Sequence, residues 1–480
     1  MELVELQRAE LGDQLAALRG ELETWRERAK PNQTFEKHHT QVERITRQLE
    51  SYLDGLGEPE EHGGLGFAEL RALQSHLLLA HRIWAYFRSK LALRDVTWLR
   101  DPLRMADELA WECYRPARDK AEAAGMIAPG SMKEPPLVFF TSEASPFVQA
   151  RATHFVPEGV TGDDFRRLDD FRRFDDALLL LPIPVLGIPW FQIDHLPAAV
   201  VIGHEAGHAV DRDYGVVESL ASAYDALDFG DGRLAGWQAW RNEIFADVYG
   251  VLCTGPASIR ALMAYLAAEP EAIRRERLPH PRTGWGAYPT KHLRMQLNFA
   301  ALREIGLDEA AAELEAAWLA AYPSHLMKTY EEDIAKVVRL LLQTPLAVFG
   351  GKPLTAVISF TREDLARAKL LAGKIKRGSQ LGQNERLRHL FAAATLAYYD
   401  APGQYRQHAG RAGLLAQLIA AIPGGVRGRV AVVSDAAQQE ADKAQGLALL
   451  QLAREQEARR SVEDADGRTG TGDADSSAEQ

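Results

Sequence analysis

The chain has little cysteine: Cys113 and Cys253 are the two in 480 residues. They lie far apart in the sequence and form no C-x-x-C pair, so neither a disulfide framework nor a cysteine zinc knuckle is expected. A chain of this length can build a sizeable hydrophobic core without such cross-links. We therefore expect a protein suited to a reducing compartment and predict a cytoplasmic location.

No export signal and no long uninterrupted apolar run are evident in the sequence either. Acidic Glu2, Glu5 and Glu10 stand where a secretory signal carries basic residues before an apolar stretch. The longest apolar run, 177–193, is short for a membrane-spanning helix and contains three prolines. We therefore predict no membrane span, and we expect this run to form buried or edge strand.

An excess of positive charge is missing as well. The chain has 56 Lys and Arg against 67 Asp and Glu, a net charge of -11. A protein that binds nucleic acid through its phosphates needs an excess of Lys and Arg over Asp and Glu, so nucleic acid is not expected as a partner. The last stretch, Ser461 to Gln480, is acidic and has almost no apolar residues, which predicts disorder.

Hydrophobic periodicity predicts a mainly helical chain with strands in its middle. Apolar residues between Val4 and Trp25 and between Val42 and Tyr52 recur at alternating steps of three and four, which indicates an antiparallel helical hairpin. This hairpin either packs on its own domain or associates with a second copy or a partner. Further helices are expected at 67–96, 103–124, 196–213 and 236–252, and strands at 137–141, 147–155 and 177–188.

The predicted fold class is α+β, predominantly α-helical, with a small sheet followed by helices. Composition shifts and Gly/Pro-rich breaks suggest the divisions. They are 1–57 (helical hairpin), 58–130 (helical region), 131–323 (sheet and following helices), 324–435 (C-terminal helical region) and 436–480 (helical extension and acidic disordered tail).

The segment that carries chemistry is an H-E-x-x-H motif, His204-Glu205-Ala206-Gly207-His208, among mostly apolar neighbours. On a helix, positions i and i+4 lie on one face, so both imidazoles can bind one ion. The glutamate between them is then beside a metal-bound water, where a carboxylate can accept its proton. The motif alone also occurs by chance, and a buried His-Glu-His set without a metal would need other polar partners.

A zinc site of this kind needs a third protein ligand. The extended H-E-x-x-H-x-x-G-x-x-H pattern is excluded, because Asp211 and Tyr214 stand where it requires Gly and His. Further along, Glu243 and Asp247 form an acidic pair at i and i+4 on an otherwise apolar helix. Such carboxylates are costly to bury unless they meet a cation or a donor, which a bound metal or a helix salt bridge with Arg241 supplies.

These residues resemble the gluzincin metallopeptidases, in which H-E-x-x-H on one helix is completed by E-x-x-x-D on a later one. The resemblance covers roughly the strands before the motif and the two helices. It implies a zincin-like domain at 131–323 that binds one Zn²⁺ per chain through His204, His208 and Glu243. It also implies that Asp247 accepts a hydrogen bond from a zinc-bound histidine, His204 first. Asp213 and Glu218 remain the fallback ligands.

The predicted activity is hydrolysis of peptide bonds in oligopeptides or proteins, with Glu205 as general base. Gluzincins stabilise the oxyanion with Tyr or His, which points to Tyr288 and His292, with Arg294 behind them; a loop that merely caps the next helix is the other interpretation of this stretch. We see no phosphate-binding loop and no serine-hydrolase elbow. Two alternatives stay open: a zincin-fold binding or scaffold protein, and a zinc hydrolase acting on a non-peptide bond.

Overall fold

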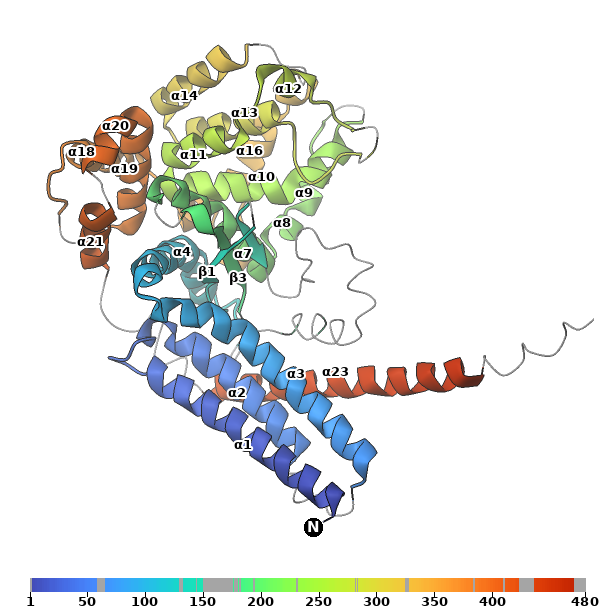
Figure 1. Cartoon of the computed structure of the whole chain (residues 1–480). Helices are drawn as coiled ribbons and strands as arrows, with labels where there is room; N and C mark the ends of the chain where they lie inside the picture. Colours follow the sequence, from blue (N-terminus) through green and yellow to red (C-terminus); the bar gives the residue numbers. More distant parts are fainter. Residues whose placement is uncertain are drawn as a thin grey trace, which may run out of the picture.

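The computed structural model shows a mostly helical protein with one small sheet (Figure 1). This agrees with the predominantly α-helical α+β class expected from the sequence. Within the described part of the chain, no helix is both long and apolar enough to cross a membrane. The structure describes residues 2–57, 65–128, 133–143, 145–149, 176, 180, 183–192, 195–229, 232–280, 282, 284–323, 328–382, 385–408, 411–422 and 436–469.

The N-terminal part is a bundle of long helices. Helices α1 (Leu3–Ala29), α2 (His39–Leu56) and α3 (Phe67–Ala92) pack against one another, as Figure 1 shows in blue. The stripe of leucines on α1 and Trp25 at its end face this core. The predicted hairpin is therefore present, and α3 covers it within the same chain.

The last described helix, α23 (Ala436–Thr469), returns to this bundle and packs along α2. Gly446 allows the close approach, because a Cβ there would lie 2.2 Å from the main-chain oxygen of Gln48. Helix α23 is described as far as Thr469, beyond Ser461, where the sequence predicts a disordered tail; residues 470–480 lie outside the described part, and the disorder of the tail stays a prediction.

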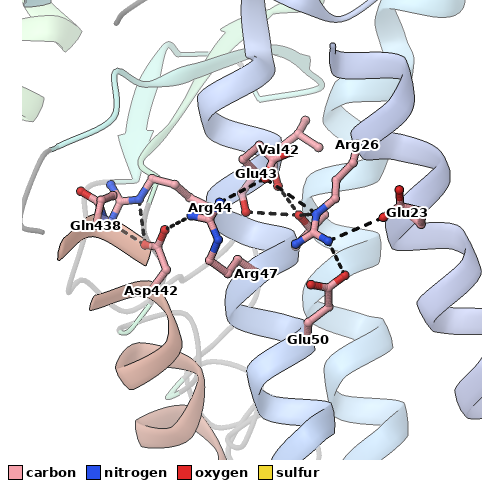
Figure 2. A network of polar contacts seen from close by, with 10 residues as sticks. Glu23, Arg26, Val42, Glu43, Arg44, Arg47, Glu50, Gln438 and Asp442 are labelled. Carbon is pink, nitrogen blue, oxygen red and sulfur yellow. Dashed lines mark hydrogen bonds and ion pairs between the residues drawn. The ribbon is translucent and has the colours of Figure 1, made fainter. Parts of the chain in front are cut away.

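A buried polar cluster fastens α23 to α2 (Figure 2). The carboxylate of Asp442, which is fully buried, accepts hydrogen bonds from Arg44 Nε at 3.0 Å and Arg47 Nη1 at 2.9 Å. Gln438 donates to the same carboxylate at 3.0 Å. Residues almost 400 positions apart in sequence are thereby joined by charge-assisted hydrogen bonds.

The sheet has three short strands in the order β1-β3-β2: β1 (Leu137–Thr141), β3 (Val185–Pro189) and β2 (Phe147–Gln149). Strand β1 is parallel to β3, and β2 is antiparallel to it. The first strand has the expected bounds. Of the strand expected at 177–188, the structure shows β3 from Val185, while Leu180 lies in a turn. Residues 177–179, 181 and 182, and the part of 147–155 after Gln149, lie outside the described residues.

Alternation along the strands divides the interior in two. Leu137 and Val185 join the core of the N-terminal bundle, whereas Val138 and Leu186 join a larger core behind the other face. This larger core runs from helix α4 (Thr97–Ala123) to α21 (Arg411–Ala421), so it joins residues from the predicted divisions 58–130, 131–323 and 324–435.

The chain leaves β3 through two 3-10 turns, η4 (Trp190–Gln192) and η5 (Leu196–Val201), and enters the central helices. Helix α7 (Ile202–Tyr214) packs on α4 and on α10 (Leu234–Thr254). The other helices between them and after them are α8 (Val216–Ser219), α9 (Ala221–Asp225), α11 (Pro256–Leu266), α12 (Pro270–Arg275) and α13 (Lys291–Glu304).

The C-terminal helices complete the large core in two groups: those that directly follow α13 pack on it, and those nearer the C-terminus, which include α21, pack on α11, η5 and α4 (Figure 1). They are separated at the Gly/Pro breaks that the sequence indicates near 349–353 and 401–403. Their bounds are α14 (Asp308–Ala321), α15 (Lys328–Glu331), α16 (Ile334–Gln343), α17 (Leu354–Val357), α18 (Arg362–Lys376), α19 (Leu387–Asp400) and α20 (Pro402–His408).

Candidate metal centre

Helices α7 and α10 approach each other closely because glycines stand at their interface. A Cβ on Gly207 would lie 2.9 Å from Tyr249 Cβ and 3.0 Å from Ala246 Cα, and one on Gly203 would lie 3.0 Å from Cys253 Cβ. Larger side chains at these two positions of α7 would push the helices apart. The close contact lets side chains from both helices meet at one point.

Three side chains converge there: His204 and His208 from α7 and Glu243 from α10. The two Nε2 atoms lie 3.2 Å apart, and Glu243 oxygens lie 3.5 Å from each of them. Ligands about 2.0–2.1 Å from a tetrahedral zinc ion are about 3.4 Å apart. The separations therefore fit a metal ion, and Glu243 Oε2 is buried without a hydrogen-bond partner among the described residues.

Asp247 sets the orientation of His204. Its Oδ1 lies 2.8 Å from His204 Nδ1, and since an ionised carboxylate only accepts hydrogen bonds, Nδ1 carries the proton. The lone pair of Nε2 then faces Glu243 and His208, which is the tautomer a metal requires. The contact between Asp247 and His204 that the resemblance implies is thus present in the structure.

Asp247 is itself held by α13. Arg294 donates from Nε and Nη2 to its two oxygens at 2.5 and 2.8 Å, and Asn298 donates at 3.3 Å. All three side chains are buried. This fork leaves the carboxylate fixed in one orientation.

The electrostatics of the site favour a positive charge between the ligands. Burial works against the charged imidazole of His204, but its contacts with Asp247 and Glu243 prevail and raise its pKa to about 10. Burial likewise opposes ionisation of Glu243, yet the two histidines lower its pKa to about 2. A proton or a metal cation can supply this charge, and the two compete for the same nitrogen.

Glu205 lies beside the cluster and faces a cavity of about 980 Å³. Its side chain is 5 % exposed, and burial raises the pKa of the carboxyl, although His204 and His208 oppose the shift. The same cavity is lined by Tyr288 and Arg294. Arg294 also places its Cζ 5.0 Å from the centre of the Tyr288 ring, so one side chain contacts both Asp247 and the tyrosine.

The other predicted residues lie elsewhere. His292 does not line the cavity: its ring is buried, accepts a hydrogen bond from Trp318 at 3.2 Å and lies 3.3 Å from Glu331. The structure therefore does not bring His292, a predicted oxyanion donor, together with Tyr288 and Arg294 at the cavity. Among the fallback ligands, Asp213 accepts a hydrogen bond from the Tyr114 hydroxyl and Glu218 pairs with Arg241.

The role of Arg294 was missed in the sequence, where it ranked only as a third oxyanion donor. Its spacing of four from Asn298 places two polar side chains on one face of α13. This spacing could have indicated from the sequence that Arg294 and Asn298 act together. It could not identify Asp247 as the partner, because the two residues are 47 positions apart.

In comparisons with known proteins, no family model, curated protein or solved structure matched this chain. The functional argument therefore rests on the residues of the site.

Proposed function

We propose that this chain is a zinc-dependent peptidase with a gluzincin-like site. His204, His208 and Glu243 bind the metal, and Glu205 is the general base. The observation that carries the proposal is the convergence of three ligand atoms at separations suited to one tetrahedral ion, next to a buried carboxylate that faces a cavity. A structural site has no use for that carboxylate, which argues against a scaffold role.

Each side chain has a distinct task in this proposal. A bound zinc ion would lower the pKa of a coordinated water and polarise the scissile carbonyl. Glu205 accepts the proton of the attacking water and passes it to the leaving amine. Asp247 keeps His204 in the tautomer that binds metal, and Arg294 keeps Asp247 in place.

Tyr288 is the proposed donor to the oxyanion. Burial, and then the charge of Glu243, raise the pKa of its phenol to about 12 against the opposing effect of Arg294. The hydroxyl therefore stays protonated at neutral pH and can donate a hydrogen bond to a developing negative charge. The residue as a whole is 51 % exposed and lines the cavity, so it is accessible to a substrate there.

The test combines metal content with hydrolysis of a mixed peptide library. The purified chain should contain about one zinc per molecule and cleave peptides until a chelator is added. Glu205→Gln should keep its zinc while hydrolysis falls about a hundredfold or more, and Glu243→Ala should lose zinc. Glu218→Ala is the matched control, because this exposed glutamate pairs only with Arg241 in the described structure and should leave both readouts unchanged.

Two results would count against the proposal in different ways. Absence of zinc after zinc-replete expression would remove the metal assignment. Zinc without chelator-sensitive cleavage of any library peptide would leave a metal site and favour a hydrolase of a non-peptide bond or a binding protein.

A further inference from the structure

The cavity that reaches Glu205 is lined by two unlike sets of side chains. Helix α11 contributes apolar side chains, among them Ala261, Leu262 and Leu266. The segment from the end of α12 to the start of α13 contributes Arg275, Arg277 and Lys291, together with Glu276. A substrate in this cavity therefore meets both apolar surface and basic side chains.

Most of the positive charge in this cavity is already matched within the chain. Three of its four Arg and Lys side chains have carboxylate partners in the described structure. These pairs are Lys291 with Glu276, Arg294 with Asp247 and Arg275 with Glu271. Arg275 shares the Glu271 carboxylate with Arg274, so these pairs reduce the positive charge that a substrate meets but do not remove it.

Arg277 is the exception. It has no carboxylate partner among the described residues. Its Nη1 donates to the main-chain oxygens of Arg274 at 2.9 Å and Glu276 at 3.0 Å, which directs the guanidinium. Nε and Nη2 make no hydrogen bond in the described structure, and two parallel N–H groups of this kind match a carboxylate.

We propose that Arg277 binds a carboxylate of the substrate and so selects acidic peptides. The inference rests on the proposed peptidase activity and names the substrate class of that same cavity. A peptide can supply the carboxylate from its C-terminus or from an Asp or Glu side chain. The shared chemistry is a bidentate guanidinium–carboxylate pair.

The experiment uses the full zinc-loaded chain and the library peptide that it cleaves best. That peptide is made with a free or amidated C-terminus, and with Glu or Gln at each position flanking the cleaved bond. Rates are compared for the wild type, Arg277→Gln and Arg274→Gln. Arg274 is the matched control, because it is on the same segment, pairs with Glu271 and does not line the cavity.

A second readout separates binding from chemistry. In the Glu205→Gln background the peptide should bind without being cleaved, and its Kd can be measured by fluorescence anisotropy. Loss of one charge-assisted pair at a partly solvated site should weaken binding of the acidic peptide about tenfold. The Kd of the acidic peptide should also rise with ionic strength when Arg277 is present, and it should rise less for Arg277→Gln.

The inference predicts that one acidic form is preferred about tenfold, and that Arg277→Gln abolishes this preference while Arg274→Gln keeps it. A preference for the free C-terminus identifies the terminal carboxylate, and a preference for Glu over Gln identifies a side chain. Cleavage without either preference, or a preference that survives Arg277→Gln, overturns the inference and leaves the peptidase proposal standing. Failure to cleave any library peptide overturns the proposed function itself.

Discussion

Replacing Asp247 by alanine should damage stability and metal binding together, because this carboxylate has two partners with different roles. It orients His204, and it is the counter-charge of Arg294. Arg294 is only 7 % exposed, so the substitution leaves an unpaired guanidinium inside the protein. Breaking a buried pair in this way costs about 3–5 kcal/mol, and loss of an orienting partner lowers metal affinity about 10- to 100-fold.

The two effects can be separated with a second substitution. Asp247→Ala combined with Arg294→Met removes the orphaned charge and keeps a side chain of similar length. Replacement of a whole buried ion pair by apolar residues is often neutral, so most of the 3–5 kcal/mol should return. Zinc affinity should not return, because His204 still lacks the acceptor for its Nδ1 proton.

The assays are urea denaturation of the zinc-free proteins and zinc titration against a competing chelator. Zinc-free protein is needed for the first, because a bound metal adds its own stabilisation. Recovery of zinc affinity in the double variant would refute the orienting role of Asp247. Unchanged stability of Asp247→Ala would refute the assignment of Arg294 as a buried cation that depends on this partner.

Two further predictions concern residues outside the site. Asp442→Ala should cost about 3 kcal/mol in urea denaturation by leaving Arg44 and Arg47 without their shared acceptor, while zinc content stays unchanged; equal stability would show that the cluster does not hold α23. Burial lowers the pKa of Lys90 from 10.5 to about 7, so the unfolded chain binds more protons between these values and the folded state gains stability as pH rises through this window. The free energy of unfolding of Lys90→Met should therefore exceed that of the wild type by about 2–4 kcal/mol at pH 6, a range that allows for the loss of the attraction between Lys90 and the Tyr86 ring. This difference should shrink by pH 9. A difference that stays constant with pH would contradict the prediction.

What the sequence by itself determined was local. The spacing of four between His204 and His208 places both rings on one face of any helix that contains them, whatever packs around it. The same logic predicted the helices of the N-terminal bundle and the bounds of β1, since periods of 3.6 and 2 are properties of neighbouring residues. The acidic pair on α10 was recognisable from its apolar surroundings, and the resemblance supplied its expected role.

The tertiary structure decided how these local pieces meet. The glycine-lined contact of α7 with α10 brings Glu243 to within 3.5 Å of both histidines, and the position of α13 gives Arg294 to Asp247 while it turns His292 away. The return of α23 to α2 was equally beyond reach of local patterns. A periodicity tells which face of a helix is buried but not which partner covers it, because that choice depends on how all the helices of the core pack at once.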